Sequence, residues 1–291
     1  MKLSKKIISL TAAALAVCLT LASCSAQKED NGVAYEKDMK ISTAADLEGK
    51  AVAVQLRSAE DDYIVSHKLT NYPKRYDDMT NAVQALIDKK VAAVVVDSNY
   101  AKQLTEGVEG VKIVEERIGS VEYRFLLNKS QAKLAEKINA QIAAIKESDD
   151  YQAMIESELV SGKVYRVAKD SDKELNKTFT LISEPSFAPF VYENGGQLKG
   201  LFAAMADGVA YGCGGKLSTT TVEPVEINDT SSASEEEITA FVDNVADTVK
   251  GKKNTFCVVT SEAAEDDTVF VTTDSFYTSE LVMIIRVEEK K

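Results

Sequence analysis

The chain has 291 residues, of which 45% are hydrophobic, so it can bury the core of one large domain or two ordinary ones and is neither disordered nor fibrous. Acidic residues outnumber basic ones by 46 to 34, and the resulting negative surface repels phosphate backbones, so we expect no nucleic-acid partner. A single histidine, His67, argues against hydrolase triads and zinc sites, and we expect neither a metal nor another cofactor.

The chain begins with the features of an export signal. Three lysines precede an apolar run from Ile7 to Leu21, and small residues follow it. The tetrapeptide Leu-Ala-Ser-Cys that ends at Cys24 resembles the lipobox of bacterial lipoproteins, in which the cysteine becomes the acylated N-terminus. The resemblance implies removal of residues 1–23, lipidation of Cys24 and attachment to the extracytoplasmic face of the cell membrane. An ordinary signal peptide with a fortuitous cysteine is the alternative.

Only two cysteines, Cys213 and Cys257, remain in the folded part of the exported chain. Export permits a disulfide between them, but their spacing gives no reason to place them together. Two separate thiols are therefore expected, and a bridge stays open.

Residues 24–40 are polar and predict a tether. The next segment predicts a strand at Ala51–Val54, a helix at Met79–Ile87 and a fully apolar strand at Val91–Val96. This alternation of strand, helix and strand predicts an α/β fold with a parallel sheet that is covered on both faces. The following residues predict two more strands and two helical stretches, at Val111–Val114, Tyr123–Leu127, Leu134–Ile145 and Tyr151–Leu159.

Residues 161–177 are polar and without periodicity, which predicts a surface linker. A second α/β unit follows it. Ser234 and Glu237 predict a capping box at the start of a helix that ends near Val249. The other expected elements are strands at 178–182, 219–227, 255–259 and 281–287 and a helix at 198–211, with Pro224 interrupting the second of these strands.

Several segments resemble the family 3 extracellular solute-binding proteins, the polar amino-acid receptors of ABC importers. Residues 41–55, Ile-Ser-Thr-Ala-Ala-Asp-Leu-Glu-Gly-Lys-Ala-Val-Ala-Val-Gln, resemble the beginning of that family's second lobe. The resemblance implies a two-lobed, type II periplasmic-binding-protein-like fold. Further matching segments are Met79–Asp97, Leu134–Leu159, Glu184–Phe190 with Gly195 and Gly200, and Phe276–Met283.

The order of these segments differs from the family's order. The second lobe comes first, at residues 41–124, and the hinge and return helices follow at 125–160. The linker at 161–177 then leads to the family's first lobe at 178–287, so the chain resembles a circularly permuted receptor. The permutation implies that only the segment near Tyr123 joins the lobes covalently, and that the return helices pack on the lobe of residues 178–287. Two half-receptors that need a partner chain are the alternative.

The resemblance also implies a ligand site between the lobes, with altered residues. The family clamps a ligand carboxylate with an arginine of its first lobe, but no arginine occurs between Arg166 and Arg286. Arg57 and Ser58 stand where the family has Gly-Thr, so Arg57 is a replacement clamp or an exposed loop residue. Asp97 stands at the family's ammonium-binding position, and a plain cap at the end of its strand is the alternative.

Three further candidates lie in the loop after residue 183. Phe187 and Phe190 stand where the family places an aromatic ring against the ligand's side chain, and core packing is the alternative for both. Glu184 is a weaker candidate for an ammonium contact. The complete set of expected ligand-binding residues is Arg57, Ser58, Asp97, Glu184, Phe187 and Phe190.

The predicted function is a membrane-anchored binding protein that closes on a small polar solute, an amino acid or related amine, and presents it to an ABC transporter permease. No reaction is implied. One alternative is a degenerate binding fold with a structural or signalling role and no amino-acid binding. The other is an enzyme with a carboxylic acid in the cleft, for which Glu184 and Glu262 are the candidates.

Overall fold

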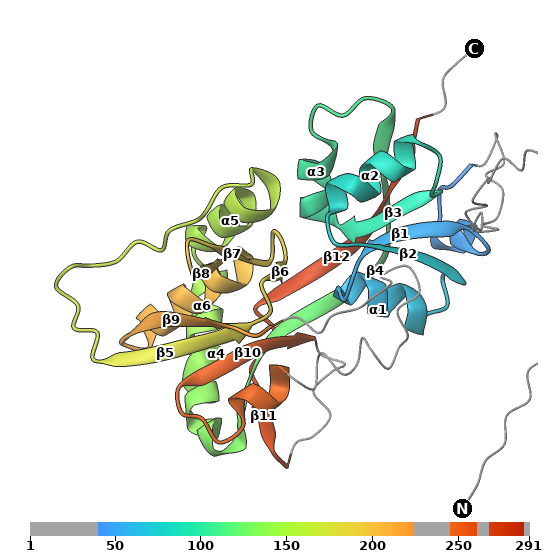
Figure 1. Ribbon diagram of the computed structural model, residues 1–291. Helices are drawn as coiled ribbons and strands as arrows, with labels where there is room; N and C mark the ends of the chain where they lie inside the picture. Colours follow the sequence, from blue (N-terminus) through green and yellow to red (C-terminus); the bar gives the residue numbers. More distant parts are fainter. Residues whose placement is uncertain (1–39, 224–244, 261–267, 288–291) are drawn as a thin grey trace, which may run out of the picture. The chain divides into compact units, whose positions relative to one another are not determined.

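The computed structural model describes residues 40–223, 245–260 and 268–287, all within one compact unit of the chain (Figure 1). Their elements alternate between helices and strands, and one large mixed sheet runs through them in the order β2-β1-β3-β12-β4-β10-β5-β9. The α/β class and the two-lobed arrangement predicted from the sequence are confirmed. The permuted lobe order stays a prediction.

The N-terminal lobe, residues 40–110, contains the parallel strands β2, β1 and β3 in that order. Helices follow the strands, as expected for a parallel sheet covered on both faces. In chain order its elements are η1 (Ala44–Leu47), β1 (Ala51–Gln55), α1 (Ala59–Ser66), β2 (Tyr72–Tyr76), α2 (Met79–Ile87), β3 (Ala93–Asp97) and α3 (Ser98–Thr105).

Strand β3 lies in the interior of this lobe because its residues are apolar on both faces. Val94 and Val96 belong to the main hydrophobic core, whereas Val95 packs into a second cluster on the other face of the sheet. Helix α2 begins where the Asp78 carboxylate accepts a hydrogen bond from the Thr80 amide at 2.8 Å. The predicted elements at both places are therefore confirmed.

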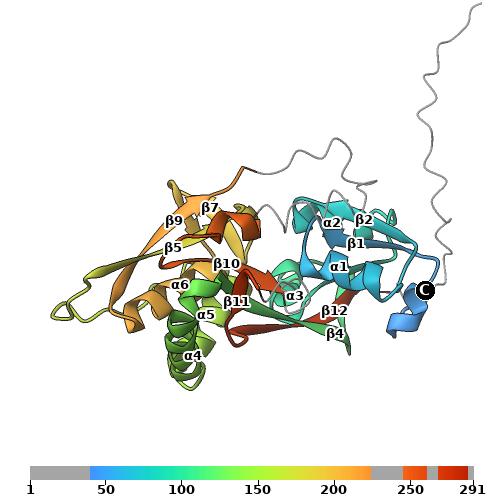
Figure 2. The same cartoon turned by 90° about the horizontal axis from the view of Figure 1, so that it is seen from below.

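The C-terminal lobe, residues 129–276, surrounds helix α6, which is preceded by a small antiparallel sheet of β6, β7 and β8. Helices α4 and α5 contact α6 (Figure 2), and the π-helical turn η3 contacts α3 of the N-terminal lobe. Its elements are η2 (Lys129–Gln131), α4 (Ala132–Lys146), α5 (Asp149–Ile155), η3 (Glu156–Val160), β5 (Lys177–Ser183), β6 (Ser186–Phe187), β7 (Val191–Asn194), β8 (Gln197–Lys199), α6 (Leu201–Gly212), β9 (Gly215–Thr221), β10 (Thr255–Thr260) and β11 (Phe270–Thr272).

Two strands, β4 (Val111–Asn128) and β12 (Tyr277–Arg286), run from one lobe to the other. Strand β12 pairs with β3 through residues 281–284 and with β4 along most of its length, and the last part of β4 pairs with β10. The prediction of a single covalent connection is therefore wrong. Residues 281–284, placed with the C-terminal lobe from the sequence, pair with β3, because the apolar stretch that ends β12 completes the N-terminal sheet.

The prediction of separate strands at Val111–Val114 and Tyr123–Leu127 is also wrong, because both belong to the 18-residue β4. The charged residues between them suggest a turn, but they are exposed strand residues at the point where the pairing of β4 with β12 shifts register. Strand β9 ends at Thr221, before Pro224. Residues 245–249 are helical, while the rest of the helix predicted after Ser234 lies outside the described residues.

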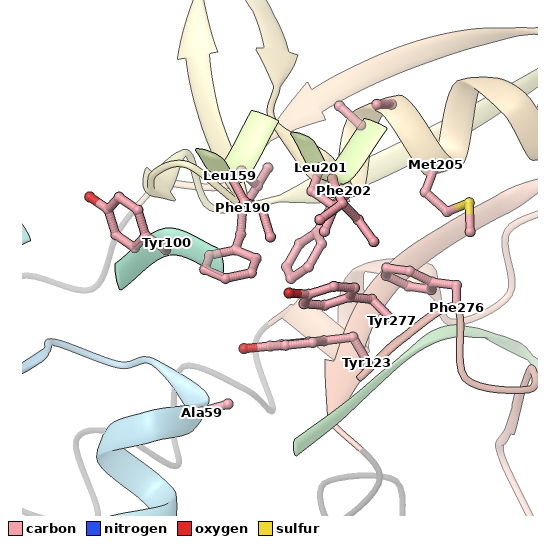
Figure 3. Close-up of a cluster of buried hydrophobic side chains, with 14 of the residues drawn as sticks. Ala59, Tyr100, Tyr123, Leu159, Phe190, Leu201, Phe202, Met205, Phe276 and Tyr277 are labelled. Atoms are coloured by element: carbon pink, nitrogen blue, oxygen red, sulfur yellow. The ribbon is translucent and has the colours of Figure 1, made fainter. Parts of the chain in front are cut away.

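An aromatic cluster fills the region where β4 and β12 meet the C-terminal lobe (Figure 3). The rings of Tyr123 and Phe202 lie 4.8 Å apart, and those of Phe125 and Phe276 are stacked at 4.4 Å. Among the described residues, none of the helices has the length and apolar character needed to cross a bilayer.

Candidate functional site

A cavity of about 100 Å³ lies among residues of both lobes and of strand β4. A buried water needs on the order of 10–15 Å³ measured in the same way, so the space admits a molecule of a few heavy atoms. The N-terminal lobe contributes Leu56, Arg57, Ala59 and Asp62, strand β4 contributes Tyr123, and the C-terminal lobe contributes Ser183, Glu184, Ser186, Phe187, Val191, Phe202, Val245, Val258, Val259 and Thr260.

Arg57 and Glu184 meet across the cavity in a buried ion pair. The Arg57 Nη1 atom lies 2.6 Å from the Glu184 Oε1 atom, and the two side chains are 9% and 4% exposed. Arg57 follows β1 and Glu184 follows β5, so each residue stands at the carboxyl end of a parallel strand. This is the edge at which open α/β sheets commonly bind ligands. The structure thus brings together two candidates that the sequence placed in different lobes.

The backbone of Arg57 adopts the left-handed conformation, with φ of 60°. This conformation costs a residue with a side chain on the order of 1–2 kcal/mol and favours glycine. Arg57 therefore adopts the turn at an energetic cost. The strained turn directs a guanidinium to the cavity.

Glu184 accepts a second hydrogen bond on the same oxygen. The Ser186 hydroxyl donates to Oε1 at 2.6 Å, while the buried Oε2 atom has no hydrogen-bond partner among the described residues. A second contact between the lobes joins the Gln55 side-chain amide to the Ala188 carbonyl at 3.4 Å. The cavity wall therefore keeps an unsatisfied acceptor next to the ion pair.

Ser58 starts helix α1 and does not line the cavity. Its hydroxyl accepts a hydrogen bond from the Asp61 amide at 3.1 Å, and the side chain is buried. The first turn of α1 carries Glu60, Asp61 and Asp62. Three acidic residues at this terminus disfavour an anion, so the predicted contact between Ser58 and a ligand carboxylate has no support from its position.

Asp97 is buried and occupied by four hydrogen bonds. One carboxylate oxygen accepts from the Asn99 and Tyr100 amides at 2.8 and 3.0 Å, and the other accepts from the Tyr277 and Ser279 hydroxyls at 2.7 and 2.8 Å. Burial raises the pKa of Asp97. The residue does not line the cavity, so its position favours the alternative stated above, a cap at the end of its strand.

The two phenylalanines occupy different surroundings. Phe187 lines the cavity, whereas Phe190 is fully buried in the aromatic cluster, with its ring stacked on Phe187 at 4.7 Å. Phe187 therefore forms an apolar wall for a ligand, and Phe190 supports that wall from behind.

Sequence reasoning missed three polar residues at or beside the cavity. Tyr123 and Asp62 line it, and Glu60 is buried next to the lining residue Ala59. Glu60 and Asp62 have the pattern of ordinary acidic residues in a first helical turn, and Tyr123 that of a strand residue. Only their positions at or beside the cavity, seen in the structure, distinguish them.

The described residues contain no group of three or more metal-ligating side chains. Cys213 and Cys257 are free thiols, and no disulfide links them. Burial raises the pKa of Cys257 to about 12, which makes this thiol unreactive. Cys24 and Glu262 lie outside the described residues.

No protein-family model and no curated protein matches the sequence. Among solved structures, the regulator CbnR in complex with its target DNA shares 12% identity over 84% of this chain, with a TM-score of 0.40, and the chain spans 65% of that regulator's length. The GluR0 ligand-binding core with L-glutamate shares 9% identity over 83% of this chain and 85% of that one, with a TM-score of 0.37.

A phosphate-binding protein of a phosphate ABC transporter from Streptococcus pneumoniae TIGR4 shares 9% identity over 81% of this chain and 88% of that one, with a TM-score of 0.44. The likeness concerns the two-lobed α/β fold alone. Because these TM-scores lie below 0.5, the ligands and the DNA named for these proteins carry no weight for this chain.

Proposed function

We propose that the chain is a binding protein for a small zwitterionic solute, an amino acid or related compound, which it holds between its lobes. The observation that carries this proposal is the buried pair of Arg57 and Glu184, which faces a cavity lined by both lobes. No chemical step is part of the proposed function.

The ion pair favours a ligand that carries both a negative and a positive charge. A zwitterion that separates Arg57 from Glu184 places its carboxylate on the guanidinium and its ammonium on the glutamate, so every buried charge keeps a partner. A pure anion that binds Arg57 leaves Glu184 without its cation, and a pure cation that binds Glu184 takes the glutamate away from Arg57. An uncompensated buried charge costs about 3–5 kcal/mol, which corresponds to at least a hundredfold difference in affinity.

Arg57 takes part in this proposal as the carboxylate clamp. A guanidinium can hold a carboxylate through two parallel hydrogen bonds, which a lysine ammonium cannot do. The N-terminal lobe then supplies the contact for which the sequence offers no arginine in residues 167–285. Phe187 provides an apolar surface for the rest of the solute.

Export, lipidation at Cys24 and delivery to an ABC transporter permease complete the proposal. They are supported by the lipobox at residues 21–24 and by the sequence resemblance. The Cys24→Ser variant is expected to move from the membrane to the soluble exported fraction, because the acylated cysteine supplies the membrane affinity. Unchanged membrane retention would contradict the anchor.

One observation favours a second candidate, a binding fold that has lost its ligand and serves a structural or signalling role. Arg57 and Glu184 neutralise each other directly, so contacts between the lobes form without a solute. The enzymatic alternative has less support at Glu184. Its Oε1 atom is already engaged by the Arg57 guanidinium and the Ser186 hydroxyl.

A thermal-melting screen separates these candidates. The exported chain is tested with the twenty protein amino acids, with their analogues that lack the amino group, and with their decarboxylated amines. We expect at least one amino acid to raise the melting temperature, and its two singly charged analogues to raise it far less at the same concentration. The absence of a shift with every amino acid would contradict the proposed function and favour the degenerate binding fold.

A further inference from the structure

Glu60 is a buried acid that the ion pair between the lobes does not use. It stands in the first turn of α1, is 3% exposed, and neither of its carboxyl oxygens makes a hydrogen bond of acceptable geometry with a described residue. Burial raises the pKa of Glu60 to about 7, and the neighbouring Asp97 acts in the same direction. A buried carboxyl group without partners is costly, so its presence calls for an explanation.

A second unsatisfied group lies beside it. The Tyr123 hydroxyl is buried and has no hydrogen-bond partner among the described residues, although Tyr123 lines the cavity. Its hydroxyl end lies on the side of Ala59, the first residue of α1 (Figure 3). Burial raises the pKa of Tyr123, and of the nearby charges the Glu60 carboxylate contributes most to this shift. The two unsatisfied groups are therefore electrostatic neighbours, with Tyr123 on the cavity wall and Glu60 buried behind it, next to the lining residue Ala59.

The surroundings of Glu60 are acidic or neutral. Its own helix adds Asp62, β3 ends in Asp97, and the α3 and β4 residues Tyr100 and Tyr123 both have a pKa raised in part by Glu60. Asp97 is saturated by its four hydrogen bonds and can accept no ligand donor. The positive charge of Arg57 is paired with Glu184 on another part of the wall.

We propose that Tyr123 on the cavity wall and Glu60 behind it form a subsite for a primary ammonium group, in place of the saturated Asp97. The proposal rests on the proposed function and specifies which residues receive an amine. A primary ammonium has three N–H donors, and the subsite offers two carboxyl oxygens and one hydroxyl oxygen that lack donors. A ligand with a second amine can then occupy Glu184 and Glu60 together.

Methylammonium chloride tests the subsite directly, because it has the ammonium group without a carboxylate. Its dissociation constant is measured with the exported chain by titration in thermal melts at pH 6 and pH 8. Glu60 is mostly protonated at the lower pH and mostly ionised at the higher one, so we expect about tenfold tighter binding at pH 8. Tetramethylammonium chloride at the same ionic strength is the control, since its charge is equal and it has no N–H donors.

Three variants complete the experiment. Glu60→Gln keeps the shape of the side chain and removes the charge, and it should abolish the pH dependence and weaken methylammonium binding at pH 8 at least tenfold. Tyr123→Phe should weaken binding at both pH values. Glu122→Gln is the matched control and should behave as wild type, because Glu122 is a partly exposed neighbour of Tyr123 that pairs with Arg124.

The subsite is contradicted if methylammonium fails to bind, if tetramethylammonium binds equally well, or if Glu60→Gln leaves the pH dependence unchanged. Within wild type alone, equal affinity at pH 6 and pH 8 also contradicts it, so the test does not depend on the folding of any variant. If amino acids bind while these results are negative, the subsite fails and the proposed function stands. If no amino acid binds, the proposed function fails.

Discussion

The Arg57 guanidinium and the Glu184 carboxylate lie 2.6 Å apart in a buried ion pair between residues that are 127 positions apart in the sequence. One follows the first strand of the N-terminal lobe, and the other follows the first strand of the C-terminal lobe. In addition to the two strands that cross between the lobes, this pair sets how the lobes meet at the cavity. Its consequences are measurable in stability as well as in binding.

The first prediction concerns the coupling between these two residues. Arg57→Ala leaves a buried carboxylate without its partner, so we expect a loss of about 3–5 kcal/mol in the free energy of unfolding. The double variant Arg57→Ala/Glu184→Ala should lose less than the sum of the two single variants, by about 1–3 kcal/mol. Urea unfolding of the four proteins measures this cycle. Additive losses would show that the pair contributes no coupling.

The second prediction isolates the backbone strain at Arg57. Arg57→Gly and Arg57→Ala both remove the ion pair, but only glycine adopts a φ of 60° without a steric penalty. The glycine variant should therefore be about 1 kcal/mol more stable than the alanine variant. Chemical denaturation of the two proteins in the same buffer provides the comparison. An alanine variant of equal or greater stability would be inconsistent with the left-handed turn.

The third prediction assigns Asp97 to stability. Asp97→Ala removes the N-cap of α3 and the acceptor for the Tyr277 and Ser279 hydroxyls, so we expect a loss of about 3 kcal/mol or more. Ligand affinity, measured by calorimetry below the melting transition, should stay within a few-fold of wild type. A variant that keeps its stability and loses ligand binding would contradict this assignment and indicate that Asp97 contacts the ligand.

The fourth prediction is a pH dependence caused by Glu60. The native carboxyl holds its proton up to a pKa of about 7, whereas the unfolded carboxyl loses it near 4.5, so wild type loses stability as the pH rises between these values. Over this range the loss from Glu60 approaches about 3 kcal/mol and remains at higher pH.

Glu60→Gln removes this dependence. The stability of the variant minus that of wild type should therefore increase by up to about 3 kcal/mol between pH 4 and pH 8, as measured by urea unfolding at each pH. Burial also raises the pKa values of Asp61 and Asp97, but both proteins retain these groups, so their contributions largely cancel in the difference. A stability difference that does not change with pH would refute a buried carboxyl group with a raised pKa at this position.

Elements with strong local patterns could be predicted from the sequence. Burial determines the residue types of these elements, so their patterns can be recognised in the sequence. Examples are the alternating Ala-Val run at β1, the apolar β3, and the helical spacing of Ile138 and Ile142 in α4. Strand β2 was missed, since Tyr72, Pro73 and two basic residues do not resemble a buried strand. The full length of β4 was also missed, because its charged middle suggests a turn but lies where the pairing with the distant β12 shifts register.

The candidate site could be predicted only in part, for the same physical reason. The sequence identified Arg57 and Glu184 separately, but only the folded lobes bring their side chains together. Asp97 was overvalued because its position at the end of a strand suits a ligand contact and a helix cap equally well. Glu60 and Tyr123 could not be identified from the sequence, because the lack of hydrogen-bond partners for a buried polar group becomes visible only in the folded structure.

The most direct test of the account is a calorimetric titration with the amino acid that gives the largest shift in the melting screen. It is carried out on the wild-type chain without residues 1–23, on its Arg57→Ala variant and on its Arg117→Ala variant. Arg117 is an exposed arginine of β4 that pairs with Glu280, and it serves as the matched control. We expect binding to wild type and Arg117→Ala with the same affinity, and binding at least a hundredfold weaker to Arg57→Ala. Equal affinity for all three proteins would contradict binding of a zwitterion between Arg57 and Glu184.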